Sequence, residues 1–261
     1  MVTSITAIFG LAAVIGGASG DLSVEEIVKR TNHAAYYQGN NGRARVSMVI
    51  TDGQGRKRER ELSILRYDAP GPDGEQKFYL YFHAPADVAR MTFLVHKHLD
   101  RDDDRWLYIP ALDLVKRIAA TDKRTSFVGS DFLYEDVSGR QLDQDHHELL
   151  KTTENFYLLK HTPKDPDSVK FAHYTMWIHK KSFLPTKVEY SDASGEVYRV
   201  MTVGRVETID GKPTVLEATM EDRRTGSRTV LTYKDPAYDI GVPERVFTER
   251  YLRRAPVKYL K

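Results

Sequence analysis

The sequence contains no cysteine, which excludes disulfide bonds and a lipid-modified N-terminal cysteine. It also lacks an excess of charge of one sign, because 39 basic and 37 acidic residues nearly cancel and no long block of like charge occurs, which argues against a nucleic-acid partner. No glycine-rich phosphate loop is present, which argues against nucleotide chemistry. Beyond the N-terminal segment, no stretch is apolar for the ~20 residues that a membrane-spanning helix needs. The 41% hydrophobic residues instead predict a sizeable folded core.

Residues 1–20 resemble a secretory signal peptide, with an apolar run over residues 5–15 followed by small residues. We expect cleavage after Gly20 or Ser19. A buried N-terminal helix or a membrane anchor is the alternative interpretation of this segment. Export without an anchor would give a soluble protein of the periplasm, and the rest of the chain, residues 21–261, has no linker or repeat and is predicted to be a single domain.

The mature sequence begins with one amphipathic helix and continues as strands. Ser23 and Glu26 have the spacing of a capping box, and Val24, Ile27 and Val28 recur at helical spacing, which predicts a helix that ends near Gly39. About a dozen runs with the composition of strands follow, separated by short turns without helical crossovers, which predicts a mainly antiparallel sheet. A second short helix is expected after Pro243.

Several predicted strands carry large apolar side chains on both faces. In the segment FYLYF, Phe78, Leu80 and Phe82 lie on one face and Tyr79 and Tyr81 on the other, because side chains alternate along a strand. A curved sheet or partial barrel whose two faces are both covered explains this pattern. The aromatic residues on its concave side would form either a packed core or the wall of an apolar cavity.

Metal sites are a weak interpretation of the acidic and histidine residues. Asp100, Asp102 and Asp104 alternate as in a calcium loop, but the glycine and glutamate that such a loop requires are replaced by Arg105 and Ala111. The histidines have neither the spacing of a zinc-binding helix motif nor a cysteine partner. We therefore expect a solvated turn at these aspartates, and neither a metal nor a cofactor.

The segment SFVGSDFLYEDV, residues 126–137, allows two interpretations. Ser130 and Asp131 follow Gly129 as a nucleophile and an acid would, but the motif lacks the second glycine and the context of an esterase. A turn explains it better, because glycine permits the bend and serine or aspartate caps backbone amides. We expect no catalytic residue here. Glu135 and Asp136 would then form ion pairs in a clasp or docking patch, with candidate partners that are all basic: Arg117, Lys123 and Arg124.

Residues 106–136, WLYIPALDLVKRIAATDKRTSFVGSDFLYED, resemble the signature of the bacterial outer-membrane lipoprotein-sorting family, the LolA-like group with its treponemal-type subgroup. Residues 184–235 and 242–252 follow the same order of elements. The resemblance implies an α+β fold, mainly antiparallel β: an unclosed barrel of about eleven strands around an apolar cavity, with a helical lid. It also implies a carrier of lipid or lipoprotein acyl chains across the periplasm, or a partner of RND-type (MMPL-like) exporters.

On this basis we expect an acyl chain to bind among a set of aromatic and apolar residues: Phe93, Val95, Trp106, Tyr108, Phe127, Phe132 and Tyr134. The helix of residues 23–38, with Val24, Ile27 and Val28, would be the lid. Burial of a chain of ~16 carbons, at about 0.8 kcal/mol per CH2, would contribute roughly 10 kcal/mol before the costs of binding. The alternative function is a sensor or adaptor that binds a protein partner with the same barrel and transfers no cargo.

Overall fold

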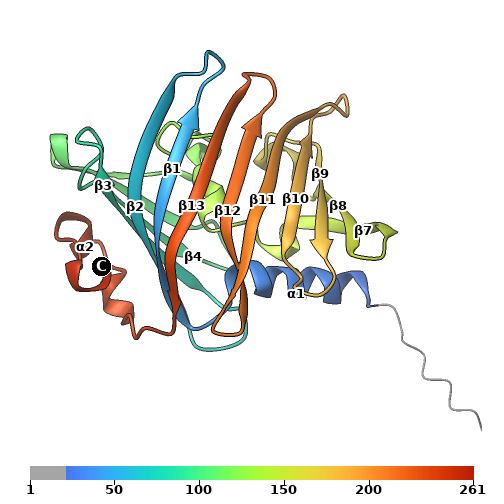
Figure 1. Ribbon diagram of the computed structural model, residues 1–261, viewed down its shortest axis with the longest axis horizontal. Coiled ribbons are helices and arrows are strands. Elements are labelled where there is room, and N and C mark those ends of the chain that lie inside the picture. Colours follow the sequence, from blue (N-terminus) through green and yellow to red (C-terminus); the bar gives the residue numbers. More distant parts are fainter. Residues whose placement is uncertain (1–21) are drawn as a thin grey trace, which may run out of the picture.

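A single antiparallel sheet of thirteen strands dominates residues 22–261, the part of the chain that the structure, a computed structural model, describes (Figure 1). The strands lie in the order β6-β5-β4-β3-β2-β1-β13-β12-β11-β10-β9-β8-β7. Their bounds are β1 Asn41–Thr51, β2 Lys57–Asp68, β3 Gln76–Ala84, β4 Thr92–Lys97, β5 Asp104–Ile109, β6 Leu114–Arg117, β7 Asp145–Thr152, β8 Phe156–Pro163, β9 His173–His179, β10 Pro185–Ser191, β11 Val197–Ile209, β12 Lys212–Asp222 and β13 Ser227–Tyr238.

The sheet is curved but unclosed. Its two edge strands, β6 and β7, are consecutive in the chain but lie at opposite ends of the strand order, and they are connected by residues 118–144. The mainly antiparallel class and the unclosed form agree with the prediction. The count of about eleven strands is wrong, since thirteen are present.

Alternation along the strands gives the sheet two different faces. On β3, Phe78 and Leu80 are buried on the concave side, where they lie beside Val95 and Phe93 of β4. Tyr79 between them is buried on the outer side. Both faces of this part of the sheet are therefore covered, as the sequence pattern indicated.

The outer face of β2–β5 is covered by the C-terminal segment. This segment contains a 3-10 turn at Glu244–Val246 and the short helix α2, Arg250–Arg253, with Pro243 directly before the turn. Figure 1 shows α2 and the C-terminus beside β3 and β4. The segment packs Phe247 and Leu252 against the sheet. The expected second helix thus exists, but it lies on the outer face and is no part of a lid.

The helix α1, Val24–Tyr36, lies across one end of the curved sheet (Figure 1). Ser23 caps it as predicted, with its Oγ accepting a hydrogen bond from the Glu26 amide at 3.2 Å. Within residues 22–261, no helix is long and apolar enough to span a bilayer. The predicted signal peptide, residues 1–20, lies outside the described residues.

Candidate ligand cavity

A cavity of about 470 Å³ lies on the concave side of the sheet, beneath α1. Small-molecule sites typically have volumes of ~300–1,000 Å³ and mostly apolar walls. The walls here come from α1, from β1–β3 and β7–β13, and from residues 127–142 of the segment that connects the two edge strands. Many of the lining side chains are apolar, among them Val46, Met48, Leu80, Phe132, Met176, Val188, Met201, Met220 and Leu231.

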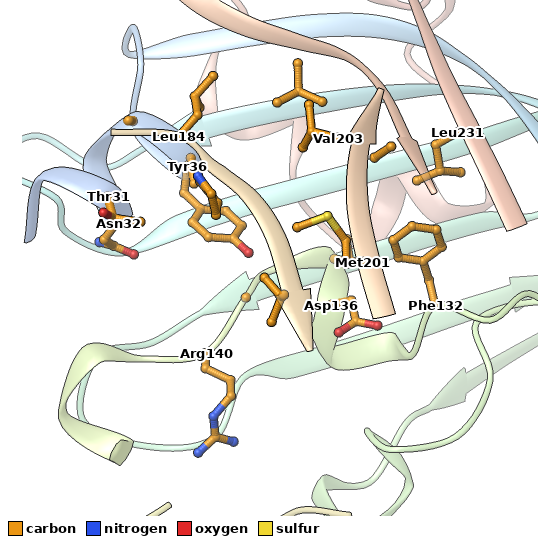
Figure 2. Close-up of a pocket in the computed structure, with 18 of the residues that line it drawn as sticks. Thr31, Asn32, Tyr36, Phe132, Asp136, Arg140, Leu184, Met201, Val203 and Leu231 are labelled. Atoms are coloured by element: carbon orange, nitrogen blue, oxygen red, sulfur yellow. The ribbon is translucent and has the colours of Figure 1, made fainter. Parts of the chain in front are cut away.

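Methionine is concentrated in this wall. The chain has six methionines, and four of them line the cavity: Met48, Met176, Met201 and Met220. Figure 2 shows Met201 facing Phe132 and Tyr36 across the space between β11, the connecting loop and α1. Because methionine is unbranched and flexible, such a wall can adapt to chains of different shape.

The predicted cavity residues divide into three groups, of which two lie on the concave side. Phe127 and Phe132 line the cavity. Phe93, Val95 and Tyr134 are buried in the adjoining core, where the Phe93 ring lies 5.3 Å from that of Phe127 and 5.2 Å from that of Tyr134. The connecting loop therefore fills the concave side of β3–β5 with its own aromatic side chains, Phe127 and Tyr134, which are called the plug below. The cavity lies beside this plug.

Trp106 and Tyr108 are not in the cavity, which corrects the prediction. On β5 they lie on the outer face, packed against the C-terminal segment, while Leu107 between them is buried on the concave side. The Trp106 ring contacts that of His96 at 5.1 Å, and the Arg253 guanidinium lies 5.6 Å from the Tyr108 ring. Alternation along β5 explains why Leu107 and its two neighbours lie on opposite faces, but the sequence pattern does not show which face is concave.

The predicted lid residues anchor α1 at its N-terminal end. Val28 lines the cavity, and Ile27 and Val24 pack with Leu159 of β8 and Ile178 of β9. Apolar contacts thus hold α1 on the half of the sheet that the connecting loop leaves uncovered.

Arg66 of β2 holds the other end of α1. Its guanidinium donates hydrogen bonds to the carbonyl oxygens of Tyr36 at 2.6 Å, Gln38 at 2.5 Å and Gly39 at 2.6 Å. The Tyr36 carbonyl belongs to the last residue of the helix, and it also accepts a hydrogen bond from Gln76 Nε2 at 2.8 Å. Arg66 also lies 3.1 Å from Asp68, whose pKa burial raises to about 6.

Tyr36 packs directly on the backbone of Gly139. A Cβ atom at Gly139 would lie 2.5 Å from Cζ of Tyr36, and the φ angle of Gly139 is +71°. Glycine is therefore required twice here, for space and for the left-handed conformation. The Lys97 ammonium lies 5.1 Å from the Tyr36 ring and donates to the Ser138 carbonyl at 2.9 Å.

The Gly-Ser-Asp triplet forms a turn. Gly129 has φ +78°, and Ser130 donates to the Phe127 carbonyl through both its amide, at 3.0 Å, and its Oγ, at 2.7 Å. The Asp131 carboxylate accepts hydrogen bonds from Thr229 Oγ1, at 2.6 Å, and from Ser227 Oγ. The triplet thereby docks the connecting loop onto β13.

Asp136 completes this clasp through a partner that the sequence did not reveal. Its carboxylate accepts from the Leu133 amide at 2.6 Å and forms an ion pair with Arg199 of β11. Arg199 also donates to the Asp131 carbonyl at 3.1 Å. Glu135 is 8% exposed and lines the cavity, and burial raises its pKa, with the Asp136 charge as the second cause.

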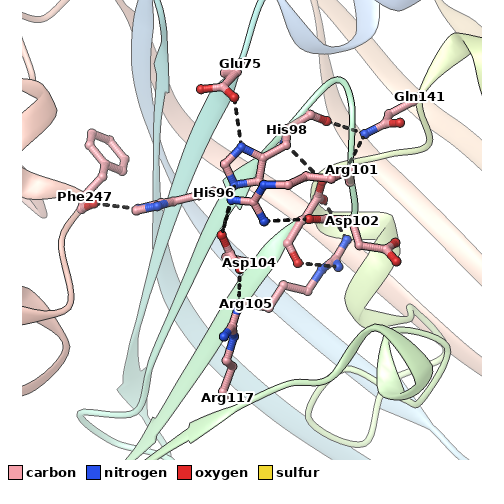
Figure 3. A network of polar contacts seen from close by, with 11 residues as sticks. Glu75, His96, His98, Arg101, Asp102, Asp104, Arg105, Arg117, Gln141 and Phe247 are labelled. Carbon is pink, nitrogen blue, oxygen red and sulfur yellow. Dashed lines mark hydrogen bonds and ion pairs between the residues drawn. The ribbon is translucent and has the colours of Figure 1, made fainter.

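The three predicted ion partners of Glu135 and Asp136 bind elsewhere, which corrects the predicted clasp. Arg117 pairs with Asp104, as Figure 3 shows, and its guanidinium lies 6.0 Å from the Trp106 ring. The other two bases are held by residues outside the clasp, Lys123 by Asp102 at 2.6 Å and Arg124 by the Asp167 carbonyl at 2.9 Å. Sequence proximity suggested these partners, whereas sheet curvature brings β11 to the loop.

The acidic turn before β5 is a network of ion pairs (Figure 3). Asp104 accepts from Arg101 at 2.7 Å and His98 at 3.0 Å, and the Arg101 hydrogen bond is the main reason that its pKa lies well below the usual range. Asp103 pairs with Arg105 at 2.7 Å. In residues 22–261 no group of three or more histidine or acidic side chains is arranged to hold a metal ion.

The sequence analysis did not predict a row of buried, hydrogen-bonded polar side chains on and beside β7–β9. Arg140 forms two hydrogen bonds to Asp145, at 2.8 and 3.1 Å, and Asp145 accepts from the Tyr174 hydroxyl at 2.9 Å. The Tyr174 ring stacks on His161 at 4.5 Å, and His161 Nδ1 lies 2.7 Å from His147 Nδ1. Burial, followed by the nearby His147, lowers the pKa of His161 to about 3. On β8, His161 follows Leu159 by two residues and therefore shares its face of the strand. This spacing was the sign in the sequence that His161 is buried.

Several solved structures share this curved, unclosed antiparallel sheet. A DUF1329 family protein from Desulfovibrio piger is 26% identical with a TM-score of 0.80, over 88% of this chain and 98% of that one. A domain from Vibrio parahaemolyticus, described as an outer membrane lipoprotein-sorting protein domain, is 26% identical with a TM-score of 0.80, over 89% of this chain and all of that one. A LolA superfamily protein from Nitrosomonas europaea, 18% identical with a TM-score of 0.68, covers 88% of this chain and 100% of its own and shares the fold.

An unclosed antiparallel sheet with a cavity under an N-terminal helix thus defines the class of this protein. A family model described as "Uncharacterized protein" matches residues 74–254, well over half of the chain. The chain belongs to this LolA-like family, as its resemblance in sequence predicted. No curated protein matches it.

Proposed function

We propose that this protein is a periplasmic carrier that binds an acyl chain of a lipid or lipoprotein in the cavity and passes it between membrane partners. The observation that carries the proposal is the cavity of about 470 Å³ with its largely apolar wall, covered by a helix that could open. The similarity to a lipoprotein-sorting domain supports it. An RND-type exporter is the partner that the family resemblance favours.

The driving force would be the removal of hydrocarbon from water. Each CH2 group that enters the cavity contributes about 0.8 kcal/mol, so a chain of a dozen or more carbons offsets the costs of association. The methionines of the wall add contacts without fixing one chain shape.

A carrier of this kind needs no catalytic group. The Ser130 hydroxyl donates to the Phe127 carbonyl at 2.7 Å, and the Asp131 carboxylate is occupied by Thr229 and Ser227. Both residues thus serve the turn, and we propose that the protein is not an enzyme.

Filling the cavity tests the proposal. Ala218 of β12 is 8% exposed and lines the cavity, so Ala218→Trp would occupy space that a ligand needs. Loss of contact with only two CH2 groups of a ligand would weaken binding about tenfold or more. Displacement of a fluorescent fatty acid by palmitoyl compounds measures this effect.

Thr219→Trp is the matched control, because the adjacent side chain of β12 lies on the opposite face of the sheet. The proposal requires acyl binding by the wild type and by Thr219→Trp, with strong loss in a folded Ala218→Trp. Equal binding by all three proteins, or no binding by any, would overturn it.

A further inference from the structure

The C-terminal segment, residues 245–261, carries a concentrated positive charge. It holds six of the chain's 39 basic residues but only one of its 37 acidic residues, so the rest of the chain has an excess of acidic residues. All six basic side chains are exposed, and they are called the basic patch below: Arg245, Arg250, Arg253, Arg254, Lys258 and Lys261. The nearly neutral charge of the whole chain therefore conceals a local excess of positive charge.

The backbone of this segment is fixed to the outer face of the sheet. The Tyr79 hydroxyl of β3 donates a hydrogen bond to the Tyr251 carbonyl at 2.8 Å, and Ser63 Oγ of β2 donates to the Leu260 carbonyl at 3.0 Å. Leu252 and Leu260 are buried against the sheet. Because the apolar side chains of the segment face the sheet, its basic side chains are presented to solvent from a firm support.

The basic patch is largely free of partners within the protein. Among residues 22–261, Arg253 forms its only ion pair, with Asp113 at 3.0 Å, and both side chains of this pair are more than half exposed. An exposed pair of this kind is weakened by water and salt and contributes little to stability. The charge of the basic patch is therefore available to a partner outside the chain.

Exposed apolar side chains lie within and beside the basic patch. Val257 of the segment is 59% exposed, and Leu112, which precedes the Asp113 that binds Arg253, is 69% exposed. These are the two most exposed large hydrophobic side chains in residues 22–261. Leu114, on the other side of Asp113, is 44% exposed. Protruding apolar side chains among lysines and arginines are typical of surfaces that bind at a membrane interface.

A membrane with anionic lipids fits both features of this surface. Each lysine or arginine close to such a membrane strengthens binding about fivefold, and apolar side chains can enter the boundary between headgroups and acyl chains. An acidic protein would satisfy the charge as well. However, cations without fixed partners and apolar side chains that protrude suit a fluid layer of lipid headgroups better than a protein face of fixed shape.

We propose that the basic patch, together with Val257 and Leu112, docks the protein on membranes that contain anionic lipids. This inference rests on the proposed carrier function, to which it adds the surface that meets the membrane. The segment lies on the outer face of β2–β5, whereas the cavity and α1 lie on the concave side (Figure 1). Docking through the basic patch therefore leaves α1 free to open.

Binding to lipid vesicles tests the inference without any acyl ligand. The protein, purified from its own cells, is sedimented with vesicles of phosphatidylglycerol and phosphatidylethanolamine, and in parallel with neutral vesicles of phosphatidylcholine and phosphatidylethanolamine. We expect at least about tenfold tighter binding to the anionic vesicles at low salt. This preference should disappear as the salt concentration rises to about 0.5 M, because salt screens exposed charges.

Substitutions in the basic patch assign the effect to this surface. The triple variant Arg250→Gln, Arg254→Gln, Lys258→Gln should bind anionic vesicles about 100-fold more weakly, because three cations are lost. Its control removes the same number of arginines and lysines at exposed positions of the β1–β2 and β12–β13 hairpins, and it should bind nearly as the wild type does: Lys57→Gln, Arg223→Gln and Arg228→Gln.

The apolar contribution is tested separately. Val257→Asn should weaken vesicle binding about 3- to 10-fold, because the valine side chain would no longer leave water on docking. The matched control is Val206→Asn on β11, where the valine is 41% exposed but lies outside the C-terminal segment. Equal effects of the two substitutions would contradict a membrane contact at Val257.

The outcomes keep this inference apart from the carrier proposal. Equal binding to anionic and neutral vesicles, or equal losses in the two triple variants, would show that the basic patch is not a docking surface for anionic membranes. Retention on immobilised polyglutamate without binding to anionic vesicles would assign the surface to an acidic protein and also refute the inference. Acyl probes that bind in solution while vesicles do not would leave the carrier proposal intact, whereas vesicle binding without acyl binding would refute only the carrier proposal.

Discussion

At the scale of single residues, a buried histidine in the cavity wall makes the stability of the fold depend on pH. His161 is 3% exposed within the wall of the cavity, and burial keeps it neutral by lowering its pKa to about 3. An unfolded histidine has a pKa of about 6.5, so the unfolded chain binds a proton at this site that the folded chain does not. The stabilising effect of a neutral His161 is complete above pH 6.5 and is lost as the pH falls toward 3.

Replacement of this histidine should therefore make the fold more resistant to acid. The free energy of unfolding of the wild type, relative to His161→Phe, should fall by roughly 3 kcal/mol between pH 7 and pH 4. Urea unfolding at both pH values measures the difference. His146→Phe, at an exposed position of β7, is the control. Identical pH dependence of the wild type and His161→Phe would contradict the assignment.

Single residues also show which features of the site could not be predicted from the sequence. Strand alternation places Leu107 on the face opposite Trp106 and Tyr108, but it carries no information on which face is concave. The partner of Asp136 was also hidden, because Arg199 is 63 residues away in the chain and only the curvature of the sheet brings it near. The turn at Gly129 was predictable, because its residue types have a local physical cause.

At the scale of elements, α1 is held at both ends. Ile27 and Val28 pack at the N-terminal end of α1, and Arg66 binds the carbonyls of its last residue, Tyr36, and of Gln38. At the Arg66 end of the helix, Tyr36 lies against Gly139 of the connecting loop. The start of this helix was predictable from its cap, whereas its contact with the loop depends on residues a hundred positions apart.

The contact of Tyr36 with Gly139 gives a test of how firmly α1 is held, and so of its predicted role as a lid. Gly139→Ala would impose a left-handed alanine and a clash with the Tyr36 ring, whereas Gly195→Ala imposes only the first, since φ is +85° and no atom lies within 4 Å. We expect Gly139→Ala to cost about 1–3 kcal/mol more than Gly195→Ala and to raise hydrogen exchange in α1. Equal losses of stability and unchanged exchange in α1 would show that this contact does not hold the lid.

At the scale of the whole molecule, the concave side is divided between a plug and a cavity. Residues of the connecting loop such as Phe127 fill the side of β3–β5, and the space beside them stays open under α1. The fold class was predictable from strand periodicity and from the resemblance of residues 106–136. The division was not, since the same aromatic residues suit a core and a cavity wall equally well.

The central claim is that this cavity holds an acyl chain, and the bound ligand tests it most directly. The protein is to be purified without detergent from the periplasm of its own cells, and its organic extract is to be analysed by mass spectrometry beside that of Ala218→Trp. The account predicts near-stoichiometric acylated molecules with the wild type and their depletion from the variant. A wild-type protein free of lipid that also fails to take up acyl probes would contradict it.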